Sequence, residues 1–199
     1  MSGLDALRRT LSDLWDEALL IVLAGLLGGL LSLLVVTIPF VLAAQYNMAL
    51  RVSEQRVVSF RDWLALGREQ LGFFVKWSVL AAALALVLAG NVVFYLRLDA
   101  EWSWILAYAI VGLLFTWVLP QPFVPAFFLQ QKDRRLRTAL RNTAILLITE
   151  PLSMVLLWLA TALLAIPLAY FAWPLLPALL PFMALFTTHV VKRYAQPEG

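Results

Sequence analysis

Long apolar runs alternate with short charged segments along the chain. A helix crosses a bilayer with about 20 predominantly apolar residues, and several of these runs reach that length with few charges. The pattern predicts an all-α protein, a polytopic transmembrane helical bundle that forms a single membrane domain over residues 1–199. About five spans are expected, at residues 18–44, 71–96, 103–129, 149–168 and 174–191.

The segments outside the spans have helical amphipathic spacing and predict short interfacial helices. Residues 1–17 form one such segment, and two basic segments cover 45–70 and 130–148. Ser59 followed by Asp62 is typical of a capped helix start. The second basic helix should stop before Pro151, because the residue before a proline avoids the α region.

The last two spans leave two arrangements open. No charge separates residue 166 from residue 173, so Pro167 and Pro174 have to supply the turn between two crossings. One bent re-entrant element is the alternative. Small residues in the first span, Gly25, Gly28, Gly29 and Ser32, allow close helix approach, and packing within the monomer is favoured over dimerisation.

One phrase occurs three times, as VTIPFVLAAQYNMALRV (36–52), QPFVPAFFLQQKDRR (121–135) and LPFMALFTTHVVKRY (180–194). Each copy has a proline, then a hydrogen-bonding side chain eight residues later and an arginine twelve residues after the proline. We interpret the phrase as a kink, a polar contact and a cationic anchor that snorkels to the interface. A true internal repeat and a generic way of ending a span both remain open. The residues are the kinks Pro39, Pro122 and Pro181, the polar residues Asn47, Gln130 and His189, and the anchors Arg51, Arg134 and Arg193.

Composition supports the membrane class. The chain is 63% apolar and 14% charged, with a mean hydropathy of +0.88, whereas soluble domains are about 45–50% apolar and about 25% charged. The net charge is +3, but the sequence contains no nucleic-acid-binding motif, so no nucleic-acid partner is expected. The alternative of a soluble helical bundle is therefore disfavoured.

The distribution of cations predicts an orientation. Twelve of the 15 Lys and Arg residues fall in or beside the two basic segments and at the C-terminus. Because cytoplasmic loops carry the excess of Lys and Arg, we expect a multi-pass protein with its N-terminus out and its C-terminus in. Aromatic residues predict an inner interfacial belt that includes Tyr46, Trp63, Trp77 and Tyr194.

Residues suited to catalysis are few. The chain has no cysteine and one histidine, His189, so no metal site, no cofactor and no catalytic residue is predicted. The candidate polar cavity comprises Asn47, Gln130, His189 and Glu150, facing inward. Two structural alternatives stay open: Glu150 as the N-terminal residue of a helix, and His189 as a polar helix end near the headgroups.

Parts of the sequence resemble the YesL-like family of small bacterial integral membrane proteins. The resemblance rests on VVTIPFVLAAQYNMALRV with VSFRDWLALGREQLGFFVKW, and on LRTALRNTAILLITEPL. It implies a protein of the bacterial inner membrane that accompanies carbohydrate uptake, with no catalytic residues to assign. The matching positions are Thr37, Pro39, Tyr46, Arg51, Phe60, Arg61, Asp62, Asn142 and Pro151.

These patterns favour a non-enzymatic bacterial inner-membrane protein that is an accessory or component of a carbohydrate transport system. Its expected partners are the lipid bilayer, anionic lipid headgroups at the cytoplasmic face and a further membrane protein. The alternative is a small stand-alone transporter with an inward-facing polar cavity.

Overall fold

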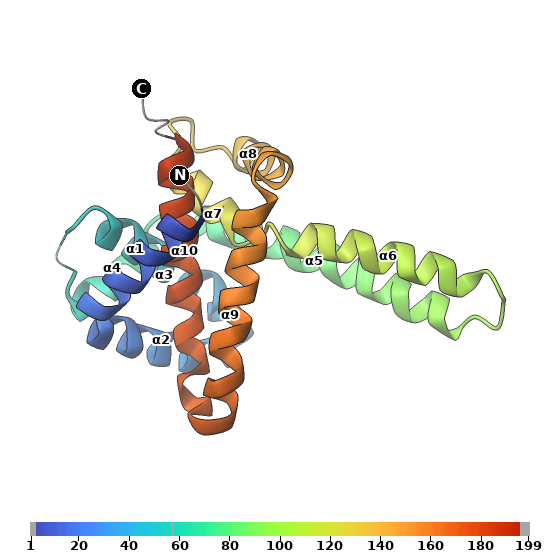
Figure 1. The fold of residues 1–199 in the computed structure, drawn as a ribbon, viewed down its shortest axis with the longest axis horizontal. Helices are drawn as coiled ribbons and strands as arrows, with labels where there is room; N and C mark the ends of the chain where they lie inside the picture. The colour runs from blue at the N-terminus through green and yellow to red at the C-terminus, as the bar shows by residue number, and fades with distance from the viewer. Residues whose placement is uncertain (1–2, 57, 196–199) are drawn as a thin grey trace.

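The computed structural model describes residues 3–56 and 58–195, which form helices joined by short connections and contain no strand (Figure 1). Two 3₁₀ turns, η1 (Val35–Thr37) and η2 (Trp173–Ala178), interrupt the α-helices. The α-helices are α1 (Gly3–Asp16), α2 (Ala18–Ser32), α3 (Ile38–Ser53), α4 (Phe60–Arg68), α5 (Leu71–Arg97), α6 (Ser103–Val118), α7 (Phe123–Gln130), α8 (Leu136–Thr149), α9 (Pro151–Phe171) and α10 (Leu179–Ala195).

Five helical stretches are long and apolar enough to cross a membrane, which confirms the all-α, multi-pass class. Four of them coincide with predicted spans, and the two after Glu150 are separate antiparallel helices joined at Ala172 rather than one bent element. The first stretch differs from its prediction. The five stretches are Val35–Ser53, Leu71–Arg97, Ser103–Gln130, Pro151–Phe171 and Trp173–Ala195.

The prediction of one continuous span over 18–44 is wrong, because the chain turns back in the middle of this run. Helix α2 ends at Ser32, Leu34 is extended, and α3 begins at Ile38. The two helices then pack against each other, and the Gln45 side chain donates to the carbonyl of Ala24 over 2.9 Å. A turn made of apolar residues leaves the hydropathy pattern unbroken, so the pattern did not reveal it.

The three prolines of the repeated phrase lie at or just after helix junctions within the membrane-length stretches. Pro39 lies in the first turn of α3, Pro122 is the residue before α7, and Pro181 is the third residue of α10. A proline needs no hydrogen-bonded N–H in the first turn, whereas in a helix interior its ring clashes with the carbonyl four residues earlier.

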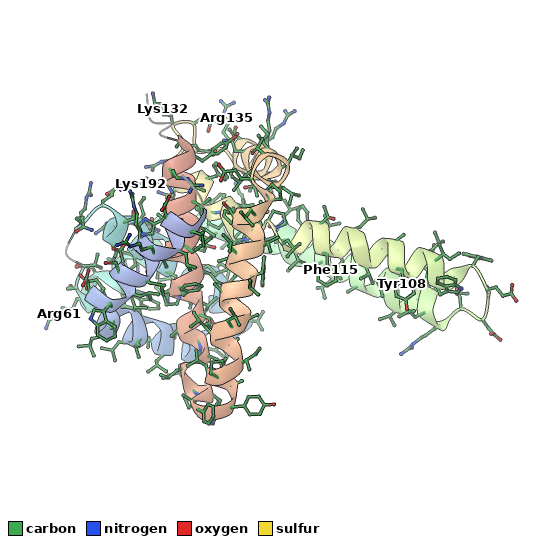
Figure 2. The ribbon with its side chains drawn as sticks, in the orientation of Figure 1. Arg61, Tyr108, Phe115, Lys132, Arg135 and Lys192 are labelled. Atoms are coloured by element: carbon green, nitrogen blue, oxygen red, sulfur yellow. The ribbon has the colours of Figure 1, made fainter. Side chains whose placement is uncertain are left out.

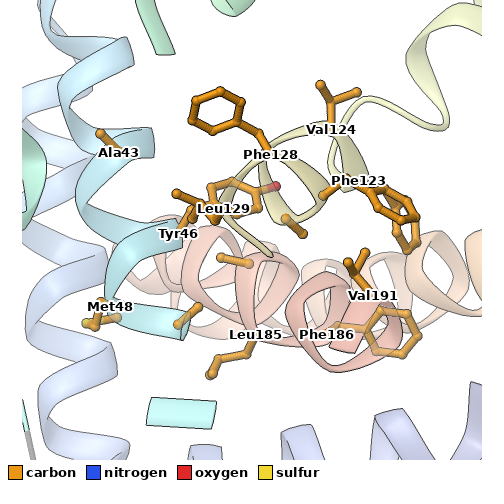
Figure 3. Close-up of a cluster of buried hydrophobic side chains, with 14 of the residues drawn as sticks. Ala43, Tyr46, Met48, Phe123, Val124, Phe128, Leu129, Leu185, Phe186 and Val191 are labelled. Carbon is orange, nitrogen blue, oxygen red and sulfur yellow. The ribbon is translucent and has the colours of Figure 1, made fainter. Parts of the chain in front are cut away.

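The three helices that follow these prolines converge at the centre of the protein (Figure 3). Their buried side chains form much of the apolar core, together with aromatic residues predicted for the inner belt. Tyr46, Trp63 and Trp77 are 4%, 0% and 7% exposed, so these aromatic side chains pack inside the protein. The residues in view are Ala43, Tyr46 and Met48 of α3, Phe123, Val124, Phe128 and Leu129 of α7, and Leu185, Phe186 and Val191 of α10.

Two helical hairpins extend from this core in different directions, one made of α5 and α6 and the other of α9 and α10 (Figure 1). The base of the α5–α6 hairpin is clamped, since the rings of Phe73 and Phe128 stack with centroids 3.5 Å apart. Trp77 Nε1 also donates to Gln121 Oε1 over 2.9 Å. Beyond this base the hairpin exposes apolar side chains, including Tyr108 and Phe115 (Figure 2).

Close packing of α2 against η2 confirms the prediction for the small residues of the first run. A Cβ on Gly25 would lie 2.7 Å from the Ala178 Cα, and one on Gly29 would lie 2.3 Å from the Pro177 ring. Only glycine leaves room for this approach, so the small residues serve contacts inside the monomer.

Candidate functional site

The last turns of α10 form a polar hub, which we define by Thr188, His189, Lys192 and Arg193. His189 Nε2 donates to Asp13 Oδ2 over 2.8 Å. Lys192 Nζ donates to the Ser53 carbonyl over 2.7 Å, and Arg193 Nη2 donates to Glu150 Oε2 over 2.8 Å. One helix end therefore ties together α1, the end of α3, and the start of α9.

The His189–Asp13 contact joins the N-terminal helix α1 to the basic C-terminal helix α10. Both side chains are largely buried, 8% and 13% exposed. Helix α1 also reaches α9, where a Cβ on Gly3 would lie 2.9 Å from Leu156 Cδ1. The described ends of the chain, Gly3 and Ala195, therefore belong to the same end of the protein.

Glu150 flanks the N-terminus of α9, which is the structural alternative stated for it above. It precedes Pro151 as the N-terminal flanking residue of α9, and its Oε2 accepts bonds from Ser153 Oγ and Arg193. Helix α8 ends at Thr149, as the following proline predicts. A carboxylate at a helix start is stabilised by the helix dipole, so the position of Glu150 needs no transport role.

Gln130 is the candidate that borders open space. Its Nε2 donates to the Thr188 carbonyl over 3.2 Å. It lies between two adjoining hollows that also share Ala195. One hollow, of about 360 Å³, is lined by Leu50, Glu54, Leu129, Gln130, Lys192 and Ala195. The other, of about 180 Å³, is lined by Phe127, Gln130, Gln131, Asn142, Val191, Tyr194 and Ala195.

Asn47 lies elsewhere and fastens α4 onto α3. Its Nδ2 lies within hydrogen-bonding distance of the carbonyls of Leu66 (3.2 Å) and Glu69 (3.4 Å), as well as that of Ala43 one turn back. The Leu66 carbonyl also accepts from the Glu69 N–H, and the Asn47 amide adds a contact from α3 to the carbonyls at the end of α4. Among the four candidates, Asn47 borders neither hollow, and His189 and Glu150 serve contacts between helices.

The predicted cationic anchors differ from one another. Arg51 pairs with Glu69 at 2.7 Å, and Arg193 pairs with Glu150 at 2.8 Å. Arg134 is exposed in the α7–α8 connection with a positive φ of 45°. Two of the three arginines thus bind a carboxylate of the same chain in addition to ending a helix.

The basic segments carry a capped helix and an exposed cationic surface (Figure 2). At the start of α4, the Ser59 backbone N–H and hydroxyl donate to Asp62 Oδ2 over 2.9 and 2.8 Å, which confirms the predicted cap. The backbone bond, and then the hydroxyl bond, lower the pKa of Asp62 from its ordinary value. The exposed cations of the two segments are Arg56, Arg61, Arg68, Lys132, Arg134, Arg135, Arg137 and Arg141.

Sequence reasoning missed several polar residues that the core depends on. Tyr46 donates its hydroxyl to the carbonyl of Pro122 over 2.7 Å, and so satisfies a backbone group at the start of α7. Gln45 is fully buried, and its amide joins α3 to α2. A glutamine inside an apolar run was the available signal, since such side chains hydrogen-bond across membrane helices.

The described residues form no metal-binding cluster, and comparison with known proteins finds no relative. Among the described residues, no group of three or more His, Asp or Glu side chains is placed to hold a metal ion. No known protein family, curated protein or solved structure matches the chain. The resemblance to the YesL-like family therefore stays a prediction.

Proposed function

We propose that the protein is a non-enzymatic component of a larger membrane assembly, an accessory of a transport system. The observation that supports this most is the α5–α6 hairpin, because its membrane-length segment Leu71–Arg97 has a window of which 0% is buried within the chain. The base is rigidly clamped by Phe128 and Gln121, so the hairpin is held out from the core. Helix surfaces of this kind are available to another membrane protein as well as to lipid.

The polar hub supports an accessory role over a stand-alone transporter. A transport path needs polar groups that face a continuous cavity. Here His189 and Glu150 each bind a charged partner of the same chain, and Asn47 binds backbone carbonyls. Their hydrogen bonds hold helices together, which suits a scaffold.

Site-specific photocrosslinking in native membranes tests this proposal. A photoreactive amino acid replaces Tyr108 or Phe115 on the α5–α6 hairpin, and Phe171 on the α9–α10 hairpin serves as the matched exposed control. We expect a discrete adduct at the first two positions, identified by mass spectrometry as a transport permease, and lipid adducts alone at Phe171. Lipid adducts alone at all three positions would contradict the proposal.

Gln130 supports the second candidate, a small transporter, because it borders both hollows at the hub. Solute flux in proteoliposomes of the purified chain would favour this function if Gln130→Ala abolished it. Glu150→Gln is the control, since Glu150 borders neither hollow. Absence of flux for a panel of sugars and amino acids in the wild-type chain would leave the accessory function as the better account.

The exposed cations of the basic segments support binding of anionic lipid headgroups. Each Lys or Arg near an anionic surface contributes about 1 kcal/mol of attraction. In nanodiscs, anionic lipid should raise the unfolding temperature more for the wild type than for an Arg135→Gln/Arg137→Gln/Arg141→Gln variant. An equal rise in both would contradict this partner.

A further inference from the structure

The α2–α3 unit has the geometry of an antiparallel helical hairpin. At its open end, Glu17 borders the same hollow as Val52 and Gln55. Further along, Gln45 bonds to the carbonyl of Ala24, and a Cβ on Gly28 would meet Val41 at 3.0 Å. The paired positions run from the open end, where the outer ends of α2 and α3 lie together, to a closed tip at residues 33–36.

This tip is apolar and unshielded by protein. Leu33, Leu34, Val35 and Val36 are 78%, 65%, 75% and 91% exposed. No charged residue occurs anywhere from residue 18 to residue 50. Exposed apolar residues at consecutive turn positions are costly in water and favourable in hydrocarbon.

The tips of the other two hairpins differ in composition from the tip of α2–α3. The α5–α6 connection carries Arg97, Asp99 and Glu101, and aromatic residues flank it. The α9–α10 connection carries the exposed Tyr170 and Trp173. Charged residues and amphipathic aromatic rings are typical of a membrane–water interface, and the tip of α2–α3 has neither.

Part of the backbone of the tip is hydrogen-bonded internally, which a lipid environment favours. The N–H groups of Leu33, Leu34 and Thr37 donate to carbonyls three residues earlier, over 3.3, 3.0 and 2.8 Å. The Thr37 hydroxyl is within hydrogen-bonding distance of the carbonyls of Leu31 and Leu34. These bonds lower the cost of placing the turn in hydrocarbon, and the N–H groups of Val35 and Val36 are the donors that they leave over.

The depth of the tip follows from the contact between α3 and the interfacial helix α4. Asn47 bonds to carbonyls at the end of α4 and so fixes the level of that helix on α3. Val36 precedes Asn47 by eleven residues, which is about 16 Å of helix at about 1.5 Å per residue. Half the hydrocarbon thickness is about 15 Å. With α4 at the membrane surface, the tip reaches the middle of the bilayer and stops there.

We propose that α2 and α3 form a re-entrant hairpin that inserts into one leaflet from the side that carries both described chain ends, with the acyl chains of that leaflet as its partner. The His189–Asp13 bond places the entrance of the hairpin beside the end of α10. The α5–α6 hairpin, which extends from the core in a different direction from α9 and α10 (Figure 1), then takes the chain across the membrane and back.

Charge supports this topology better than the one predicted from sequence. With both ends on one side, fourteen of the 15 Lys and Arg residues share that side, and Arg97 alone lies opposite. The cytoplasmic side carries the excess of Lys and Arg, so both ends are cytoplasmic. This inference does not depend on the proposed accessory function.

Cysteine accessibility tests the topology, and no native cysteine has to be removed first because the chain contains none. The single variants are Val36→Cys at the tip, Asp16→Cys at the entrance, Lys132→Cys in the α7–α8 connection and Asp99→Cys in the α5–α6 connection. Each is exposed to a membrane-impermeant maleimide in right-side-out and in inside-out vesicles. Gel filtration confirms folding of each variant, and labelling after SDS confirms its thiol.

We expect Asp16→Cys and Lys132→Cys to react only in inside-out vesicles, Asp99→Cys only in right-side-out vesicles, and Val36→Cys in neither until SDS is added. The Val36 side chain is 91% exposed in the fold, so lipid alone can protect it. A fluorophore on Val36→Cys should also be quenched more by spin labels at acyl-chain ends than by labels at headgroups.

Three results would overturn the proposal. Reaction of Val36→Cys from the Asp99 side would show that the hairpin crosses the membrane. Its reaction from the Lys132 side would show that the tip is not inserted. Reaction of Asp16→Cys from the Asp99 side would place the two chain ends in different compartments.

Discussion

At the scale of single residues, the buried pair His189–Asp13 determines where α1 lies. A buried pair contributes little over an apolar contact of similar volume, but removing one member leaves the other without its partner. This pair is nearly enclosed by protein, at 8% and 13% exposure, so loss of one member leaves a group that water cannot readily reach.

A double-mutant cycle measures this coupling. We expect Asp13→Leu and His189→Leu each to lower the free energy of unfolding by about 1–3 kcal/mol, the cost of a buried polar group without a partner. The double variant should lose less than the sum of the two. Denaturant unfolding in detergent micelles checks this, and strict additivity would show that the side chains do not interact.

The cap of α4 should make the stability of that helix depend on pH. Hydrogen bonds from Ser59 lower the pKa of Asp62, so the stabilising carboxylate form is fully present above its ordinary pKa of about 3.9. The contribution is lost as the pH falls through the lowered pKa of the folded state. Asp62→Asn should therefore destabilise the protein at neutral pH and lose this effect in acid.

Thermal unfolding of the wild type and Asp62→Asn from neutral to acidic pH checks this prediction. Asp99→Asn is a useful control, because Asp99 is exposed in the α5–α6 connection and caps no helix. Equal differences from wild type at every pH would contradict the assigned role of Asp62.

At the scale of elements, the surroundings of the glycines distinguish the helices that pack closely from those that face open space. Gly25 meets the backbone of Ala178, whereas no atom lies within 4 Å of a Cβ on Gly90. Gly25→Ala should destabilise the protein by about 1–3 kcal/mol, because the crowded backbones have to separate. Gly90→Ala should be neutral or stabilise α5 by up to about 1 kcal/mol. A loss of stability in Gly90→Ala comparable to that of Gly25→Ala would contradict the assigned packing.

The sequence predicted elements well where polar residues mark their boundaries. The spans from Leu71 to Arg97 and after Pro151 were found because charges or prolines stand at their ends. Ser59 and Asp62 likewise marked the start of α4. The turn at residues 33–36 was missed because it is as apolar as the helices it joins, so hydropathy has no contrast there.

The candidate site was predicted in part for a similar reason. Helical spacing can place Gln130 and His189 near the same end of a bundle, and Gln130, the last residue of α7, does contact α10 beside His189. Spacing does not report which carboxylate will approach His189, because Asp13 is 176 residues away in the chain. The role of Asn47 as a cap for α4 depended on the same kind of long-range contact.

At the scale of the whole molecule, one end gathers the polar contacts, and the two hairpins expose apolar side chains. The hub on α10 joins α1, the end of α3 and the start of α9, while two hairpins extend away from the core (Figure 1). Helix α1 belongs to the polar end of the protein, beside α10. Its acidic residues are neighbours of the basic segments, as the hollow shared by Asp16 and Arg56 illustrates.

The most direct test of this arrangement is a cross-link between α1 and α10 in native membranes. Asp13→Cys/His189→Cys is treated with a short bifunctional maleimide, and the chain is then cut at a protease site inserted after Lys132. The two fragments should remain joined in the double variant and separate in the control pair Asp13→Cys/Asp99→Cys. Separation of the fragments in both variants, with both thiols intact in SDS, would contradict the placement of the two chain ends together.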